Sequence, residues 1–428
     1  MPSREEVTYF GAGPAPLPTA VLQECSSALL NFNNTGLSLA EISHRSPTAN
    51  KVIADTKEAL TKLLDIPDTY DVLFLQGGGS GEFSAALQNL VSAWVERRRR
   101  RAVSELGDGP DAEAKVLERV RSEIETELKV DYLVTGSWSL KASQEAGRLI
   151  GSKYVNVALD ARKHSRDGKF TTIPEDEKAW ASRLTPRGSA ALVYFCDNET
   201  VDGVEFQSFP AALEGNEGAD ELNETFVVAD MSSNFLSRRV DVKKYGIIFA
   251  GAQKNLGIPG ITVAIIRRSL LNLVPPPAFI HSLSASLPNA TPPIVFDFTT
   301  LAKNNSLYNT LPIFNLYVAT LVLQSIVHNF SGSIAGQEHE ATTKAARLYA
   351  ALDAHPAVYH VVPDRAVRSR MNLCFHADRE AAFIKGGEGR GLLGLKGHRS
   401  VGGVRVSNYN AVPVQGVDKL VAWIEDAV

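Results

Sequence analysis

Lys254 stands on a turn between two apolar runs of the sequence, which is an unusual position for a side-chain amine. The runs are residues 246–251 and 261–266, and small or turn-forming residues fill the segment between them. A lysine on a loop is commonly a solvent-exposed charge. In a pocket, however, desolvation lowers the pKa of the amine and frees its lone pair to react with a carbonyl. This stretch alone leaves both interpretations open.

A glycine-rich turn is the second feature that could do chemistry. Residues 71–76 form a short apolar run that leads directly into residues 77–82 (GGGSGE), and a helix is predicted to open at about Phe83. Backbone N–H groups and the helix dipole make such an N-terminus a site for anions, including phosphate groups. The turn lacks the GK[ST] of a P-loop and the GxGxxG spacing. A plain tight turn is therefore the alternative interpretation.

Three further side chains follow predicted buried strands at their C-terminal ends. They are Trp138, Thr200 and Asp230, after strands at 132–135, 190–196 and 225–229. Buried strands that alternate with helices predict an α/β fold with a mostly parallel sheet covered on both faces. The ligand crevice of such a sheet lies beyond the carboxyl ends of its strands. We therefore expect these side chains, the glycine turn and Lys254 at one edge of one sheet.

Pyridoxal 5′-phosphate is one ligand that uses all five groups. The Lys254 amine can hold its aldehyde as a Schiff base, and residues 77–81 can hold its phosphate. Asp230 can keep the ring nitrogen protonated, which makes the ring an electron sink. Trp138 can stack on the ring, and the Thr200 hydroxyl can bond the phenolic oxygen. The alternative of a non-enzymatic phosphate- or nucleotide-binding protein leaves Lys254, Asp230 and Trp138 without a purpose.

The composition is that of a soluble globular protein, with 44% hydrophobic residues, 21% charged residues and a net charge of −4. It gives no reason to expect a nucleic-acid or membrane partner. The first ten residues lack the apolar core of a signal peptide. Three scattered cysteines are too few for a disulfide framework or a metal site and fit a reducing compartment. We expect a cytoplasmic protein without a metal.

Residues 96–129 interrupt the alternation of strands and helices. Five consecutive arginines open this segment, and its second part has apolar residues at helical spacing. These are Val116, Val120, Ile124 and Leu128. We interpret the segment as a solvated, charged helical insertion. Nucleic-acid binding through the arginines is disfavoured because acidic residues are interleaved throughout.

The predicted organisation is a large and a small domain. The large, cofactor-binding domain comprises residues 17–338, including the charged helical insertion at about 96–129. The smaller α+β domain comprises residues 1–16 and 339–428, where the chain changes to a polar helix followed by short strands.

Nine motifs make the sequence resemble the phosphoserine aminotransferase family, in class V of the fold-type I pyridoxal-phosphate enzymes. They are FGAGPAPLP at 10–18, EISHRSP at 41–47, LQGGGSGEFSA at 75–85, CDNETVDG at 196–203, ADMSSNFLSR at 229–238, YGIIFAGAQKNLGIPG at 245–260, YNTLP at 308–312, SRMN at 369–372 and LKGHRSVGGVRVSNYNA at 395–411. The resemblance covers nearly the whole chain apart from the insertion. It implies a fold-type I transferase and an obligate homodimer with active sites shared between the subunits.

The resemblance also assigns roles to individual residues. Lys254 falls on the family's Schiff-base lysine and Asp230 on its pyridinium partner, so these are the expected catalytic residues. The other implied cofactor contacts are Gly79, Ser80, Trp138, Thr200 and Gln253 in one subunit, with Asn309 and Thr310 supplied by the other. The implied substrate contacts are Arg405, His398 and Arg399 in one subunit, with His44 and Arg45 supplied by the other. Two positions depart from the family, since Ala12 replaces a common serine and Ser80 a larger or charged residue.

Arg405 is expected to clamp the substrate α-carboxylate, a bidentate task that suits a guanidinium. Each His–Arg pair alone would be interpreted as surface charge, but within the family motifs the two pairs are expected to receive a phosphate or γ-carboxylate.

The implied reaction is transamination between L-glutamate and 3-phosphohydroxypyruvate, giving 2-oxoglutarate and O-phospho-L-serine in L-serine biosynthesis. Other class V activities, cysteine desulfurase or alanine–glyoxylate aminotransferase, are the alternatives. A desulfurase needs a cysteine on a mobile loop, whereas the three cysteines fall in predicted helix or strand. Activity on 3-hydroxy-2-oxo-4-phosphooxybutanoate is left open.

Overall fold

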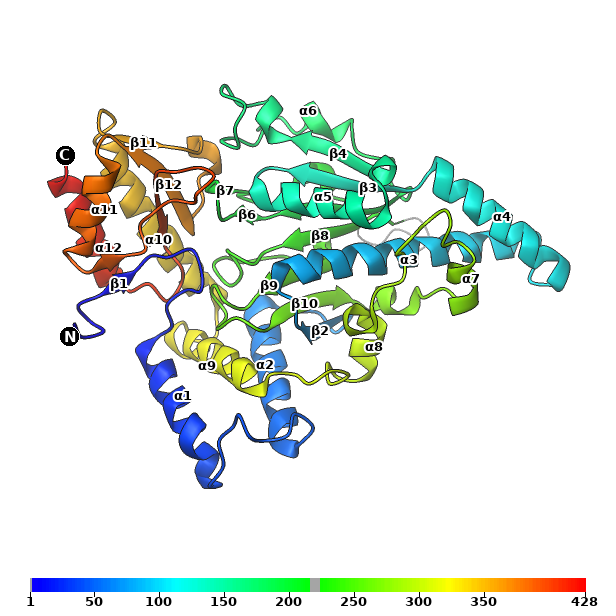
Figure 1. Ribbon diagram of the computed structural model, residues 1–428, viewed down its shortest axis with the longest axis horizontal. Coiled ribbons are helices and arrows are strands. Elements are labelled where there is room, and N and C mark those ends of the chain that lie inside the picture. Colours follow the sequence, from blue (N-terminus) through cyan, green and yellow to red (C-terminus); the bar gives the residue numbers. More distant parts are fainter. Residues whose placement is uncertain (1, 216–223) are drawn as a thin grey trace.

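The computed structural model describes residues 2–215 and 224–428, and a seven-stranded sheet forms its centre (Figure 1). The strands lie in the order β2 (Tyr70–Leu75), β10 (Thr262–Arg267), β9 (Ile247–Gly251), β8 (Phe226–Asp230), β5 (Ala190–Cys196), β3 (Lys129–Val134) and β4 (Val155–Asp160). Strand β10 is antiparallel to both of its neighbours, and all other pairs in this sheet are parallel. The predicted mostly parallel α/β sheet is confirmed.

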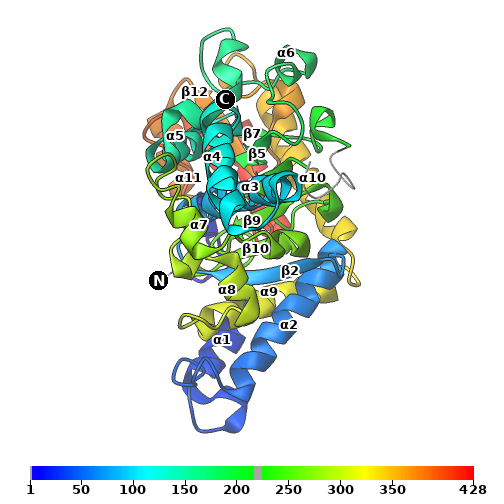
Figure 2. The ribbon, with the colours of Figure 1, turned by 90° about the vertical axis from the view of Figure 1, so that its right-hand side faces the viewer.

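Alternate side chains along the central strands separate two hydrophobic cores. On β5, Val193 and Phe195 belong to the core beneath α2 and α9, whereas Leu192 and Tyr194 belong to the core beneath α3 and α5. The helices of this part of the molecule are α1 (Thr19–Asn31), α2 (Pro47–Leu64), α3 (Gly78–Leu106), α4 (Pro110–Thr126), α5 (Ser137–Ile150), α6 (Lys178–Ala181), α7 (Pro277–His281), α8 (Phe298–Lys303) and α9 (Ile313–Asn329). In Figure 2, α1 and α2 project below the sheet. Because both faces are covered, most residues of the central strands are apolar, as is usual for parallel strands.

Helix α3 corrects two sequence-based expectations. It begins at Gly78 rather than at Phe83, so the glycine turn is itself the first turn of the helix. It also continues through the arginine run to Leu106. There Arg97 and Arg98 are only 2% and 6% exposed, and Arg98 is paired with Glu127 at 2.9 Å.

The segment at 96–129 is therefore not simply a solvated insertion. Its four spaced apolar residues on and just after α4 are buried in the core against α3, as the spacing predicted. Only the outer faces are exposed, and the charges of the inner faces are neutralised by ion pairs between α3 and the end of α4.

A third core lies in the C-terminal part of the chain, to which the N-terminal arm also contributes Phe10. Its elements are α10 (Ile334–Asp353), β11 (Tyr359–Val361), β12 (Asn372–Ala377), α11 (Glu380–Glu388), β13 (Leu392–Leu393), β14 (Val404–Ser407) and α12 (Val414–Asp426). Strand β1 (Thr8–Tyr9) pairs with β13, which ties the arm to this core. The residue boundaries of the two predicted domains stay a prediction.

Within residues 2–215 and 224–428, no single helix has the length and apolar composition needed to cross a membrane. Helices α9 and α10 satisfy that test only together, as a pair bent by 89°.

Candidate active site

Seven of the predicted site residues line one cavity at the carboxyl edge of the sheet. The cavity has a volume of about 240 Å³. The predicted residues that line it are Gly79, Ser80, Trp138, Thr200, Asp230, Gln253 and Lys254. They come from five separate stretches of sequence, each of which follows a strand of the large sheet. The convergence expected at one sheet edge is thus present, although the ligand roles of these residues stay predictions.

Lys254 reaches this cavity from the connection between β9 and β10. Its Nζ donates a hydrogen bond to Thr200 Oγ1 at 3.4 Å and lies 5.6 Å from the centre of the Tyr409 ring. The backbone turns sharply here, since Gly257 N donates to Ala252 O and Gly260 has a positive φ of 113°. A side chain at Gly13 would approach within 2.8 Å of the Lys254 side chain. The amine is therefore confined by its surroundings instead of extending into solvent.

Asp230 ends β8 and is 5% exposed. Burial raises the pKa of its carboxyl group, while hydrogen bonds from Ser232 and the charge of Lys254 act in the opposite direction. Glu82, on the first turns of α3, is 1% exposed, and burial with the nearby charge of Asp230 raises its pKa to about 8. At neutral pH the Glu82 carboxyl is mostly protonated, so it adds little negative charge beside Asp230. A cationic group above Asp230 would favour its ionised form.

The first turn of α3 faces the same cavity. Residues 77–80 line it, and no side chain caps the N-terminus of this helix by a hydrogen bond. Gly77 has a positive φ of 134°, and a side chain there would approach Phe296 within 3.2 Å, so the position requires glycine. A long helix with an open N-terminus presents N–H groups and a partial positive charge to an anion.

Basic side chains surround the outer side of this region. Arg405, on β14, donates a hydrogen bond from Nη1 to Thr200 O at 3.3 Å. The pKa of His398 is lowered by burial and by the positive charges of Arg405, Lys141 and Arg399. Arg405, Lys141 and Arg399 therefore form one positively charged cluster around His398. Its charge suits a substrate that carries more than one negative group.

Four predicted residues, Asn309, Thr310, His44 and Arg45, belong neither to the described lining of the cavity nor to this basic cluster. Asn309 Nδ2 donates to Gln76 Oε1 at 2.7 Å, and Gln76 Nε2 donates to Thr310 O at 2.6 Å. They thus lie beside the residue that precedes the glycine turn. His44 and Arg45 precede α2 and are absent from the described lining of the cavity. The structure of one chain does not bring these four to the site.

Comparison with known proteins places this geometry in a family. Residues 7–159 and 116–420 match the family model described as Aminotransferase class-V. The chain belongs to this family. Solved class-V structures include the phosphoserine aminotransferase of Bacillus circulans subsp. alkalophilus, with a TM-score of 0.77 and 32% identity over 97% of both chains. The pyridoxal-phosphate-bound phosphoserine aminotransferase of Trichomonas vaginalis has a TM-score of 0.73 and 32% identity, over 98% of this chain and 99% of that one.

Full-length sequence relatives carry the same name. The phosphoserine aminotransferase of Saccharomyces cerevisiae is 42% identical, over 99% of this chain and 98% of its own length. The phosphoserine aminotransferase of Bacillus cereus is 37% identical, over 99% of this chain and 98% of its own length. An alanine–glyoxylate aminotransferase from Nostoc is only 16% identical, with a TM-score of 0.64, and so shares the fold alone. The relatives thus agree with the resemblance carried by the nine motifs.

Two carboxylates of this class-V site were missed by sequence reasoning. Glu199 accepts hydrogen bonds from Trp138 N at 2.8 Å and Ser139 N at 2.9 Å, and Asp202 accepts one from Ser137 N at 2.7 Å. Burial and the charge of Asp202 raise the pKa of Glu199 to about 8. Together these acids hold the first turn of α5, which carries Trp138. Their position on either side of Thr200 was the available signal.

The Glu199 side chain also explains a glycine. A Cβ at Gly136 would lie 2.3 Å from the Glu199 side chain, so any larger residue would push the carboxylate away from α5. Glu199 therefore links the position of Thr200 with that of Trp138, because it neighbours the first in sequence and holds the backbone of the second.

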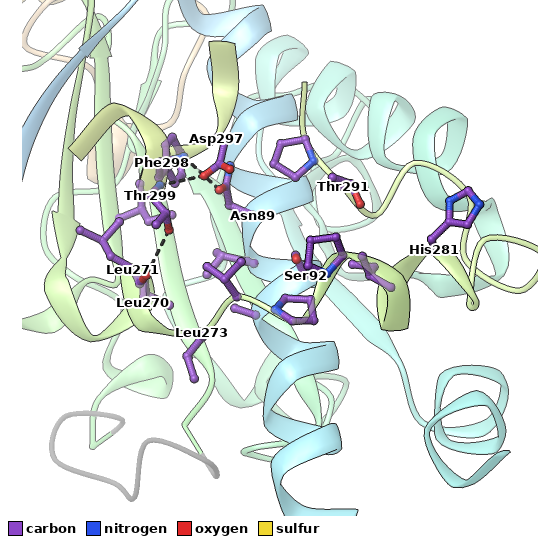
Figure 3. Close-up of a pocket in the computed structure, with 18 residues that line it drawn as sticks. Asn89, Ser92, Leu270, Leu271, Leu273, His281, Thr291, Asp297, Phe298 and Thr299 are labelled. Carbon is purple, nitrogen blue, oxygen red and sulfur yellow. Dashed lines mark hydrogen bonds between the residues drawn. The ribbon is translucent and has the colours of Figure 1, made fainter. Parts of the chain in front are cut away.

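A larger cavity, of about 430 Å³, lies away from Lys254 between α3 and residues 270–299 (Figure 3). Its lining is mostly apolar, and three of its polar side chains are already engaged. Asn89 Oδ1 accepts from Phe298 N, Asp297 Oδ1 accepts from Thr299 N, and Thr299 Oγ1 donates to Leu271 O. These groups stabilise the segment around α8. The cavity therefore lacks the reactive groups found at Lys254.

Proposed function

We propose that the cavity at Lys254 binds pyridoxal 5′-phosphate. The observation that carries this proposal is the convergence of an amine, a buried carboxylate, an indole and an open helix N-terminus on 240 Å³ of space. Lys254 would hold the aldehyde, Asp230 the ring nitrogen and Thr200 the phenolic oxygen, while the N–H groups of α3 would hold the phosphate. The burial of Asp230 fits this group, because a positive ring nitrogen would offset the cost of its buried charge.

The chain's own residues then have defined tasks in transamination. The bound cofactor supplies an electron sink for the electrons of the substrate Cα–H bond. Lys254 is the group positioned to move a proton, as general base and then as general acid. The hydrogen bond from its Nζ to Thr200 Oγ1 restrains the amine within the cavity. The hydrogen bond from Ser232 N to Oδ1 holds the Asp230 carboxyl group in place at the wall of the cavity.

We propose that the substrates are L-glutamate and 3-phosphohydroxypyruvate, with O-phospho-L-serine and 2-oxoglutarate as the products, in L-serine biosynthesis. The names of the full-length relatives support this choice. The cluster of Arg405, His398, Arg399 and Lys141 supports it physically, because both amino-acid partners carry two separated anionic groups. Arg405 would bind the α-carboxylate, and the His–Arg pair the distal group.

A homodimer is part of the proposal. Helix α1 and the loop after it expose large apolar side chains, which a second subunit would cover. They are Leu22, Leu29, Leu30 and Leu37, exposed by 37%, 44%, 80% and 51%. The predicted partner-supplied residues, His44, Arg45, Asn309 and Thr310, require the same arrangement. A cytoplasmic location is proposed with it, which suits three free cysteines.

A cysteine desulfurase is not supported. Cys196 lines the cavity, but burial and the nearby carboxylates raise its pKa well above the usual range, so the thiol stays protonated. Cys374 is also buried, and its pKa is raised to about 12. The nucleophile of a desulfurase must be a thiolate.

A coupled assay with glutamate and 3-phosphohydroxypyruvate tests the proposed reaction. We expect turnover by purified protein that is yellow as isolated and that borohydride bleaches. Colourless protein that takes up no added pyridoxal phosphate would refute the cofactor. Yellow protein that transfers the amino group only to glyoxylate would refute the substrate but not the cofactor.

A further inference from the structure

A shallow cavity of about 320 Å³ lies on the side of α10 and shares no described lining residue with the cavity at Lys254. It is lined by Thr342, Ala345, Ala346, Tyr349, Ala350, Asp353, Arg365, Arg368 and Arg370. The helix contributes small side chains and one acid, and the chain that follows contributes three arginines. The described charged residues of the lining therefore sum to a positive charge of two.

Two of the arginines share a single carboxylate. Arg365 Nη2 donates to Asp353 Oδ2 at 2.9 Å, and Arg368 donates from Nη1 and Nη2 to the same carboxylate at 2.7 and 2.9 Å. These hydrogen bonds lower the pKa of Asp353, with the largest contribution from Arg368, so the carboxylate remains ionised. One negative charge here faces two positive charges. An anion in the cavity would restore the balance.

The two guanidinium groups differ in how they are held. Arg368 is fixed, since it lies over the Tyr349 ring at 4.8 Å and its side chain is only 15% exposed. Its Nε is buried and has no hydrogen-bond partner. Arg365 is 81% exposed, so most of its five N–H donors can turn toward a ligand. Arg368 thus contributes a fixed positive charge beside the cavity, whereas Arg365 contributes exposed N–H donors.

Arg370 is engaged on the other side of the segment. Its Nη2 donates to Glu205 Oε1 at 2.6 Å, and its backbone N donates to Oε2 at 2.7 Å. Glu205 in turn faces Arg238 at 4.0 Å, and Arg238 is paired with Asp197. Glu205 is therefore shared between two arginines as well. Around the cavity, the carboxylates of Asp353, Glu205 and Asp197 are thus fewer than the four guanidinium groups with which they are paired.

We infer that this cavity binds a small anion bearing a phosphate group, with Arg365 as its main donor and Arg368 as a fixed positive charge beside it. Guanidinium groups match the geometry of a phosphate through paired N–H donors. Ala345, Ala346 and Ala350 leave the space that larger side chains would fill. The volume is near the lower limit of small-molecule sites, which suits a phosphate monoester better than a nucleotide.

An anion bound here would contact a segment that also supports the site at Lys254. Ser369, between Arg368 and Arg370, donates from Oγ to Asn198 Oδ1 at 2.5 Å and from its backbone N to Gly203 O at 2.9 Å. Asn198 lines the cavity at Lys254. The two cavities are thus connected by a short series of hydrogen bonds, and any effect of one ligand on the other must be reciprocal.

Calorimetric titration of inorganic phosphate into the full-length, cofactor-loaded protein tests the inference. Because phosphate also suits the substrate cluster, the titrations use a His398→Ala/Arg399→Ala background at constant ionic strength. We expect this background to bind phosphate. A further Arg365→Gln change should raise the dissociation constant by about tenfold or more. A parallel titration with glycerol phosphate distinguishes a monoester site from a site for free phosphate.

Arg347→Gln in the same background is the matched control. Arg347 lies on α10 and is paired with one acid, Asp418, outside the cavity, so its loss should leave the dissociation constant unchanged. Because Arg365 is largely exposed, the melting temperature of the Arg365→Gln protein without phosphate should equal that of the background. The inference is overturned if the background binds no phosphate, or if Arg365→Gln binds as tightly as the control.

Discussion

Two helix N-termini meet at the cavity of Lys254, and the chain treats them in opposite ways. The first turn of α3 contains Gly78, Gly79 and Gly81, and no side chain caps it. The first turn of α5 is closed by Glu199 and Asp202, which accept three of its N–H groups. Both helices present the same partial positive charge. The N–H groups of α3 are left for a ligand, whereas those of α5 are hydrogen-bonded by side chains of the same chain.

The difference separates two tasks of one site. An open N-terminus can bind an anion that comes and goes, but it cannot fix its own position through that anion. A closed N-terminus cannot bind a ligand, but the buried carboxylates hold its backbone and hence the indole of Trp138 in place. The site thus combines a helix end that binds with a helix end that positions.

Lys254→Ala tests whether the two helix ends serve one reactive group, and it has the largest expected effect. We expect no measurable turnover in the coupled assay, because the amine that moves the proton is gone. The variant should still bind pyridoxal phosphate at α3, although more weakly and without the yellow colour that borohydride bleaches. Lys243→Ala, on an exposed turn, is the control. Retained steady-state activity of the Lys254 variant would show that Lys254 is not the reactive group that the two helix ends serve.

Ser80→Asp places a charged side chain at the open N-terminus of α3. Repulsion of the cofactor phosphate should weaken pyridoxal-phosphate binding on the order of a hundredfold, for unit charges several ångströms apart near the surface. Equilibrium dialysis of the apoprotein measures the change. Ser80→Asn has nearly the same shape without the charge and should bind almost normally. Equal losses in both variants would mean that shape, not charge, governs this helix end.

Glu199→Gln opens the N-terminus of α5. One carboxyl oxygen is replaced by an NH2 group, which would face the N–H group of either Trp138 or Ser139 and should cost about 1–3 kcal/mol of unfolding free energy. Near-ultraviolet circular dichroism and quenching of tryptophan fluorescence should report a looser Trp138. Asp202→Asn, which faces only Ser137 N, should have a smaller effect. A larger effect of the Asp202 variant would assign the positioning role to Asp202.

Glu82→Gln tests the buried acid that α3 carries beside Asp230. The raised pKa means that the folded protein holds the Glu82 proton while the unfolded chain has released it. Stability should therefore fall as the pH rises from about 4.5 to about 8, by on the order of 4 kcal/mol from this group alone. The neutral glutamine should remove that part of the slope in urea unfolding measured at several pH values. Glu118→Gln, on the exposed side of α4, should leave the slope unchanged.

Sequence reasoning found the parts of this site that follow strands. Apolar runs marked the strands before Thr200, Asp230 and Lys254, and the rule for parallel sheets brought their ends together. It missed Glu199 and Asp202 because they act on backbone groups about 60 residues earlier in the chain. No periodicity reports such a contact. It also placed the start of α3 too late, since glycines that normally end helices here begin one.

The charged segment at 96–129 also depends on contacts that the sequence pattern does not report. Val116 and Val120 were correctly expected on one helix face, but the burial of Arg97 and Arg98 was not. A run of arginines is usually solvated, and only the packing of α4 against α3 reveals the acidic partners. His44 and Arg45 stay predictions, because their proposed task needs a second subunit.

The antiparallel strand β10 has a consequence for how the site assembles during folding. Parallel neighbours in a sheet need long crossovers, but β9 and β10 are joined directly by residues 252–261. Local pairings of this kind close in microseconds, whereas pairing β5 with β8 must first close a loop of about thirty residues. We therefore expect Lys254 to stand on its finished hairpin before its partners arrive. In this order of folding, the β9–β10 pair that carries Lys254 forms first, and the other strands that line the cavity pair with it later.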